Sequence, residues 1–326
     1  MWRLTDKAGT LEIRKVFVDT ILEIMELNDK IVALEADLGG ASGFTRIKEK
    51  FPKRFINVGI AEANMMGIAA GLSMGGYTPF VHTFAPVAVR RALDQIYISG
   101  AYSKNTINIY GSDPGICSAT NGGTHTTFED IAIMRAIPES MVFDPADGVQ
   151  LSWLIKELSA LRGVHYIRST RKGLPTIYKE GSSFSIGKGN IIKEGKDILL
   201  ISSGQLLYDA LSTAKELEEE GISLEVIDMF TLKPLDIKLI ERALQGKKAV
   251  ITFENHNIIN GLGSAVAEVM AERGVSIPLK RIGVVEAFGQ VGTVEYLKNA
   301  YGLTGERLKA AARELSKYRS SFNKKI

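Results

Sequence analysis

The stretch Gly59–Leu72, GIAEANMMGIAAGL, sets a single acid, Glu62, within a run of apolar and small residues. It follows a short β-like segment, Phe55–Val58, and it predicts a helix that is rich in Gly, Ala and Met. An acid in the first turn of a helix is stabilised by the helix dipole. If it is also removed from water, it can hold or share a proton near neutral pH. The other interpretation is a structural acid that packs against a neighbouring strand.

The composition indicates an ordinary globular protein. The chain has 326 residues, enough for two domains, with 45% hydrophobic and 24% charged residues and a net charge of +3. One basic run, KYRSSFNKKI at 317–326, is too little for a nucleic-acid surface. The single Cys117 cannot form an internal disulfide, which favours a reducing, cytoplasmic setting. We expect neither a signal peptide nor a membrane span, because the sequence shows no apolar run of the required length.

Strands and helices are predicted to alternate along the chain, which is typical of doubly wound parallel sheets. Ile31–Ala36 reads as a buried strand that ends at Asp37–Gly40, the kind of strand end where ligands bind in open α/β sheets. Upstream, Thr10 is predicted to cap a helix that continues to about Leu27. A further helix is expected over about 86–99.

Two stretches break this alternation. Gly111–Thr127, GSDPGICSATNGGTHTT, has no periodicity and is predicted to be a loop with a functional role; it carries His125. Lys179–Lys196 is polar and rich in Gly and Ser, which predicts a linker. A second series of strands and helices starts at Asp197. We therefore predict two doubly wound α/β domains, at 8–178 and 190–326.

Several blocks of sequence occur in the order seen in transketolases, and the chain resembles the second half of that family over nearly all of its length. The blocks are EADLGG (Glu35–Gly40), GIAEANMMGIAAGL, PFVHTF (Pro79–Phe84), NGGTHTTFEDIAIMRAIP (Asn121–Pro138), FDPADG (Phe143–Gly148) and FTLKPLD (Phe230–Asp236). The resemblance implies a domain that binds the pyrimidine ring of thiamine diphosphate, followed by a transketolase C-terminal domain. It also implies transfer of a two-carbon ketol unit between sugars or sugar phosphates, as in the pentose phosphate pathway.

The sequence lacks the Gly-Asp-Gly motif with which enzymes of this kind hold the diphosphate and its metal ion. Ala146-Asp147-Gly148 is the nearest string, and it matches a different block. The resemblance therefore implies one subunit of a split transketolase, with no metal ligands of its own. Mg²⁺ or Ca²⁺ and the diphosphate would be held by a separate N-terminal subunit, in an α₂β₂ assembly that includes a dimer of this fold.

The resemblance also assigns roles to individual residues. Glu62 falls on the catalytic acid that bonds N1′ of the aminopyrimidine, and His125 falls on the histidine that contacts the substrate oxygen near the reacting carbon. The remaining positions would line the cofactor or bind the substrate. The cofactor would be contacted by Asp37, Leu38, Phe84 and Val87, and the substrate by Arg14, Ser112, Asn121, Arg168 and Arg171.

Three of these positions depart from the family pattern. Asn121 replaces an acid that reads a sugar hydroxyl, Val87 replaces a second aromatic of the pyrimidine pocket, and Ser112 stands where a phosphate-binding histidine is expected. Ketol transfer is therefore expected, whereas the sugar is left open. Two alternatives also stay open: a β-subunit of a 2-oxo acid dehydrogenase, and a non-catalytic subunit that keeps only the fold. Structural roles are possible for Phe84 as a core residue and for the arginines as exposed side chains.

Overall fold

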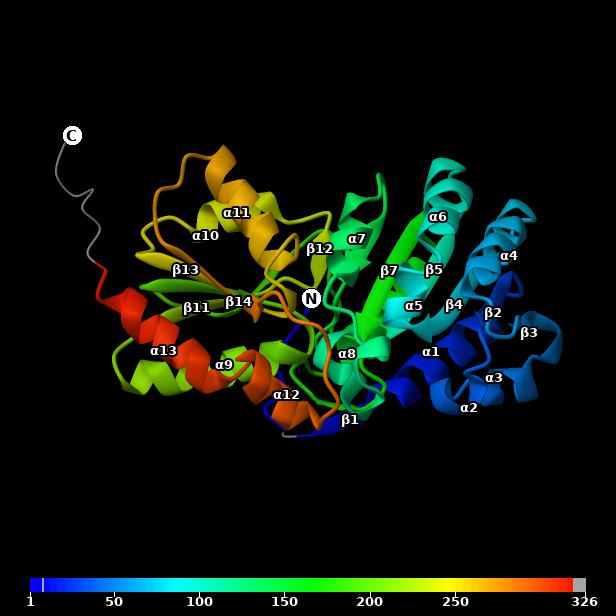
Figure 1. Ribbon diagram of the computed structural model, residues 1–326, viewed down its shortest axis with the longest axis horizontal. Coiled ribbons are helices and arrows are strands. Elements are labelled where there is room, and N and C mark those ends of the chain that lie inside the picture. The colour runs from blue at the N-terminus through cyan, green and yellow to red at the C-terminus, as the bar shows by residue number, and fades with distance from the viewer. Residues whose placement is uncertain (8, 319–326) are drawn as a thin grey trace.

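A computed structural model of the protein describes residues 1–7 and 9–318. It shows two α/β sheets, each with helices on both faces (Figure 1), which confirms the predicted fold class. Residue 8, where the first predicted domain begins, and residues 319–326, which hold most of the basic run, lie outside the described residues. No helix in the described part of the chain is long and apolar enough to cross a membrane.

The first sheet has seven strands in the order β12-β6-β7-β5-β4-β2-β3, all parallel except the antiparallel edge strand β12. Parallel strands that are covered on both faces have sequences made of nearly continuous apolar residues. An example is the fully buried sequence IVALE of β2. Its strands are β2 (Ile31–Glu35), β3 (Phe55–Asn57), β4 (Thr78–Phe84), β5 (Ile107–Ser112), β6 (Met141–Phe143), β7 (Val164–Ser169) and β12 (Thr231–Lys233).

The second sheet has five strands in the order β14-β13-β10-β11-β9, with β9 antiparallel at one edge. It consists of β9 (Asn190–Lys193), β10 (Ile198–Ser202), β11 (Leu224–Asp228), β13 (Ala249–Asn257) and β14 (Leu279–Val284). Strand β9 lies inside the predicted linker 179–196, where its short alternating pattern is hidden by polar neighbours. Strand β12 follows β11 in the chain but pairs with β6, so it joins the second half of the chain to the first sheet.

Two helical layers run across both sheets, and each encloses one apolar core (Figure 1). The lower layer in the view contains α1 (Ile13–Leu27), α3 (Thr45–Lys50), α8 (Gly148–Leu158), α9 (Leu207–Glu219), α12 (Val294–Tyr301) and α13 (Gly305–Ser316). The upper layer contains α4 (Glu62–Met74), α6 (Leu93–Gln95), α7 (Asp130–Ala136), α10 (Ile237–Ala243) and α11 (Leu262–Glu272). Helix α5 (Ala85–Val89) and the π-helix η2 (Ile96–Tyr102) contribute to the same apolar core as this layer. The short α2 (Gly39–Ser42) precedes α3.

Two local predictions were wrong. Thr10 does not cap α1, because residues 10–12 form strand β1 (Thr10–Glu12), which pairs with β8 (Gly173–Pro175). The predicted helix over 86–99 is broken into α5, α6 and η2, with Ala92 outside helical geometry. The apolar face continues through the break as a row of buried side chains, so the hydrophobic pattern does not reveal it.

Candidate functional site

The predicted site residues gather at the carboxyl-terminal edge of the seven-stranded sheet. The sheet register aligns Phe84, at the end of β4, with Ser112, at the end of β5, and Ser112 with Ser169, at the end of β7. On the other side of β4, β2 ends just before Asp37, and β3 leads into the start of α4. This edge is where open α/β sheets bind ligands.

Glu62 is the first residue of α4, as predicted, and its side chain is only 4% exposed. Its Oε2 accepts a hydrogen bond from Arg91 Nη1 at 2.6 Å. Arg91 projects from the break between α5 and α6, and its side chain is 50% exposed. A carboxylate shielded from water is thus paired with a cation that reaches it from the surface. Sequence reasoning missed Arg91, because an arginine in ArgArgAlaLeu looks like the solvent side of an ordinary helix.

Phe84 brings two other predicted residues together. The guanidinium carbon of Arg171 lies 4.7 Å from the centre of the Phe84 ring, in a cation–π geometry. The imidazole of His125 meets the same ring edge-on, with 5.5 Å between ring centres. Phe84 is half-buried, so part of this residue stays accessible to solvent.

Arg171 forms an ion pair with Asp113, an acid that the sequence did not indicate as a site residue. Its Nε donates to Asp113 Oδ2 at 2.6 Å, and its Nη1 donates to the carbonyl of Ala41 at 3.3 Å. Arg14 donates to the same carbonyl at 3.3 Å, so the two guanidinium groups converge. Arg14 also pairs with Glu12 at 2.6 Å. The contact between Asp113 and Arg171 joins the segments that follow strands β5 and β7, which lie far apart in the sequence, so the sequence alone did not reveal it.

The other predicted positions lie around this cluster. His125 is exposed in a short 3₁₀ turn, with Nδ1 2.9 Å from Thr124 Oγ1, and Asn121 is exposed earlier in the same loop. Val87, in α5, and Leu38 are half-buried, and Asp37 is exposed. The backbone N–H of Leu38 donates to the carboxylate of Glu35, a buried acid at the end of β2 whose pKa is raised by burial.

The structure contradicts the substrate-binding role predicted for Arg168. Its side chain is 1% exposed and pairs with two buried acids: Nε lies 2.7 Å from Asp130 Oδ2, and Nη1 lies 3.1 Å from Asp144 Oδ2. Burial lowers the pKa of Arg168, but these two carboxylates more than offset that effect and raise it above its ordinary value. Arg168 is therefore the centre of a buried ionic cluster and has no free face for a phosphate.

Ser112 is also too deeply buried for the substrate contact that was predicted for it. Its side chain is fully buried, and its hydroxyl lies 3.0 Å from His82 Nε2. Burial lowers the pKa of His82 to about 3, so this imidazole is neutral. The Ser112 hydroxyl serves this internal contact, because it faces the core of the sheet rather than the cleft. The prediction that it contacts substrate was wrong.

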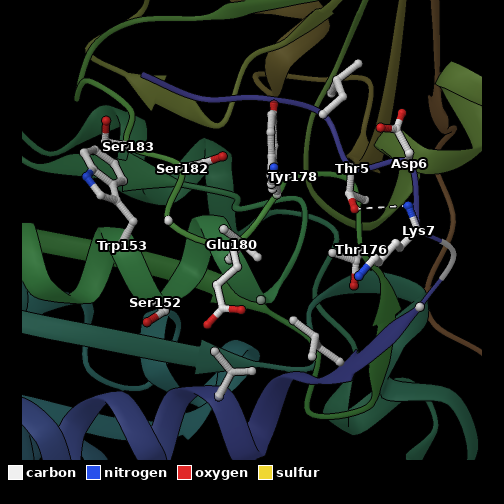
Figure 2. Close-up of a pocket in the computed structure, with 18 of the residues that line it drawn as sticks. Thr5, Asp6, Lys7, Ser152, Trp153, Thr176, Tyr178, Glu180, Ser182 and Ser183 are labelled. Atoms are coloured by element: carbon white, nitrogen blue, oxygen red, sulfur yellow. Dashed lines mark hydrogen bonds between the residues drawn. The ribbon is translucent and has the colours of Figure 1, made fainter.

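A groove of about 990 Å³ lies elsewhere, between the N-terminal segment and helix α8 (Figure 2). Thr5, Asp6 and Lys7 lie on one side of it and Trp153 on the other, and none of the predicted site residues lines it. Among residues 1–7 and 9–318, no group of three or more His, Cys, Asp or Glu side chains could hold a metal ion.

The fold defines an α/β protein with two doubly wound sheets, and a family model matches each half of the chain. The family model "Transketolase, pyrimidine binding domain" matches residues 9–176, and "Transketolase, C-terminal domain" matches residues 187–308. The chain belongs to the transketolase family, whose general function is thiamine-diphosphate-dependent ketol transfer.

Individual relatives agree with this assignment. The chain is 42% identical over 304 residues to the 6-deoxy-6-sulfo-D-fructose transketolase subunit SqwH of Clostridium sp. strain MSTE9, covering 93% of this chain and 94% of the relative. It is 33% identical to human transketolase over 96% of its own length, but that match covers 50% of the human protein. A solved structure described as split gene transketolase, inactive beta4 tetramer, has a TM-score of 0.86 and 39% identity and covers 95% of this chain and 100% of that one.

Proposed function

We propose that this chain is the C-terminal subunit of a split, thiamine-diphosphate-dependent transketolase. It would transfer a two-carbon ketol unit between sugars or sugar phosphates, together with an N-terminal subunit that holds the diphosphate and Mg²⁺ or Ca²⁺. The observation that carries the proposal is Glu62, a carboxyl group shielded from water at the start of α4 on the ligand-binding edge of the sheet. Similarity over nearly the whole chain to a transketolase subunit supports it.

The residues present fit the pyrimidine end of the cofactor. Glu62 offers a shielded carboxyl for a ring nitrogen, and Phe84 offers a half-buried aromatic face. We assign Leu38 to the support of the cofactor's shape, with Asp37 and Val87 beside it. When bound, thiamine diphosphate supplies the nucleophilic carbon that carries the ketol unit. Glu62 would hold a proton at N1′ of the pyrimidine, a role suited to a carboxyl that is shielded from water.

The substrate end would be formed by basic side chains. Arg171 is fixed by Asp113 and by the Phe84 ring, so its guanidinium is positioned before a ligand arrives. Together with Arg14, it presents a planar, bidentate donor pair suited to a phosphate. His125 lies against Phe84 and would donate to the substrate oxygen near the reacting carbon. Asn121 would face a sugar hydroxyl with an amide instead of a carboxylate.

The surface formed by α4 and η2 supports a subunit contact. Exposed apolar side chains occur on and beside α4 and η2, two elements that pack on each other. They are Ile60, Met74, Tyr97, Ile98 and Tyr102. We infer that paired copies of this chain meet the partner subunit here in an α₂β₂ complex in the cytoplasm. This surface favours an assembled complex over an isolated chain.

The test is ketol transfer by the complex reconstituted with the candidate diphosphate-binding subunit. Glu62→Ala should lower turnover by at least about 10²-fold, the usual size of a lost acid–base contribution. Glu314→Ala, at an exposed acid on α13, is the matched control and should have no effect. Turnover of Glu62→Ala within about threefold of wild type would reject the assignment. A decarboxylation assay with a lipoyl acceptor separates the 2-oxo acid dehydrogenase alternative.

A further inference from the structure

The end of strand β13, in the second domain, reaches the loop that carries His125 in the first. Pairing of β13 with β10 ends at Phe253, but β13 continues to Asn257. We propose that Asn255, on this extension, is a positioning residue that holds the His125 loop, residues 113–128, in its working shape. The proposal rests on the substrate-binding role proposed for His125. It makes the second domain part of the substrate site.

Asn255 is 3% exposed, and its side chain forms hydrogen bonds to the loop backbone on both sides of Gly115. Its Oδ1 accepts from the N–H of Ile116 at 3.0 Å, and its Nδ2 donates to the carbonyl of Pro114 at 3.1 Å. Gly115 has φ +56°, and a Cβ there would lie 2.1 Å from Asn255 Oδ1. The Asn255 amide therefore occupies space that only a glycine at position 115 leaves free. Both the donor and the acceptor of this amide are used in hydrogen bonds to the loop.

Asn255 is itself fixed from the opposite side. Its backbone carbonyl accepts from Arg168 Nη2 at 2.9 Å, which links it to the buried ionic cluster. Two residues later, the N–H of Asn257 donates to the carbonyl of Phe128 at 2.8 Å. The extension of β13 therefore holds the His125 loop near both of its ends, and the ionic cluster supports the extension.

The middle of the loop rests on another segment of the second domain. The N–H of Gly292 donates to the carbonyl of Ala119 at 3.4 Å. A Cβ at Gly123 would lie 2.6 Å from the carbonyl oxygen of Gly289, so the two backbones are in direct contact there. His125 follows Gly123 by two residues, which places its turn directly beside this contact.

The loop backbone needs such support because it is strained. Asp113 and Ala119 have φ of 55° and 47°, and neither is glycine. Residues in such conformations are strained and persist when their surroundings impose them. Loss of the Asn255 amide should therefore let the loop relax and let His125 leave the Phe84 ring.

This consequence can be measured on the isolated chain. The chain has four histidines, and His125 is the one that the structure exposes; the others are buried. Labelling histidine and phenylalanine for NMR reports the His125–Phe84 ring contact, and hydrogen–deuterium exchange reports residues 113–128. In Asn255→Ala, the ring contact should disappear and exchange in the loop should rise by about 10-fold or more.

The matched control is Asn108→Ala. Asn108 is also buried and also uses both ends of its amide, with Pro79 at 3.3 Å and His165 at 2.7 Å, but it lies at the opposite end of β5. It should disturb His165 and leave the His125 loop unchanged. If Asn255→Ala does not fold, Asn255→Asp keeps the acceptor for Ile116 and loses the donor to Pro114. An unaltered ring contact and unaltered loop exchange in a folded Asn255 variant would overturn the proposal.

The same variants in the reconstituted complex test the role in catalysis. Asn255→Ala should raise KM for the sugar or lower kcat/KM by about 10-fold or more, while affinity for thiamine diphosphate stays within twofold. Unchanged sugar kinetics despite a displaced His125 would overturn the positioning role. If the wild-type complex transfers no ketol unit, the proposed function fails, whereas the NMR and exchange results still show whether Asn255 holds the loop.

Discussion

Replacing Arg168 with methionine removes the cation that pairs with two buried acids, Asp130 and Asp144, while keeping a similar apolar stem. The guanidinium makes hydrogen bonds of 2.7 Å to Asp130, 3.1 Å to Asp144 and 2.9 Å to the carbonyl of Asn255. Both carboxylates are buried, and the hydroxyls of Tyr166 and Ser203 also donate to them. These hydroxyls cannot replace a full positive charge, so the Arg168→Met variant leaves two buried acids without a cation.

The expected loss of unfolding free energy is about 3–5 kcal/mol, the usual result of breaking a buried ion pair from one side. For a protein of this size, this loss corresponds to a fall in the thermal midpoint of roughly 5–15 °C. The loss should be larger at pH 8 than at pH 5. Burial already raises the pKa of Asp144, and Arg168 opposes that effect. Without Arg168, a proton can neutralise this acid at low pH, and stability is lost as pH rises through the raised pKa.

Thermal unfolding followed by circular dichroism at the two pH values measures both effects. Arg313→Met is the control, because Arg313 pairs with Glu220 on the surface, and its midpoint should stay close to that of wild type. A loss below about 1 kcal/mol for Arg168→Met, or a loss that grows at pH 5, would refute the reasoning about the buried cluster.

Two further predictions concern His165 and Asn121. Burial lowers the pKa of His165 from 6.5 to about 4. As the pH falls, this ring therefore takes up a proton in the unfolded chain at a higher pH than in the folded chain. The stability that depends on the neutral ring is lost as pH falls below 6.5, so the difference in unfolding free energy between wild type and His165→Gln should shrink by about 2 kcal/mol between pH 7 and pH 5. A difference that is constant with pH in urea titrations contradicts this. For Asn121, an amide binds a sugar hydroxyl more weakly than a carboxylate does, so Asn121→Asp should sharpen discrimination between donor sugars epimeric next to the carbonyl. Equal preference ratios for the two epimers in wild type and Asn121→Asp would contradict this prediction.

Much of the fold could be predicted because its physical causes are local. Strands buried on both faces must be continuous apolar runs, as in β2, and the apolar run after Glu62 indicates helix α4. The position of Glu62 follows from the same pattern. The break between α5 and α6, from which Arg91 projects, could not be predicted. The spacing of the buried residues is the same on both sides of it and does not reveal it.

The site contacts were less predictable because they join residues far apart in the sequence. Arg168 and Arg171 lie three residues apart and look alike in the sequence. Arg168 meets Asp130 in the core, whereas Arg171 turns toward Phe84 and Asp113 at the sheet edge. Asn255 contacts a loop about 140 residues earlier in the chain. Such partners are set by the packing of the two domains, which no local pattern encodes.

The central claim is that this chain supplies the pyrimidine side of a cofactor site and works only with a separate diphosphate-binding subunit. Titration of the purified chain with thiamine diphosphate and Mg²⁺ by calorimetry, with and without the candidate partner, tests it most directly. One ring contact cannot offset the cost of ordering a flexible, highly charged ligand. We predict weak or undetectable binding to the chain alone and tight binding with ketol transfer in the complex. Tight binding and ketol transfer by this chain alone would contradict the claim.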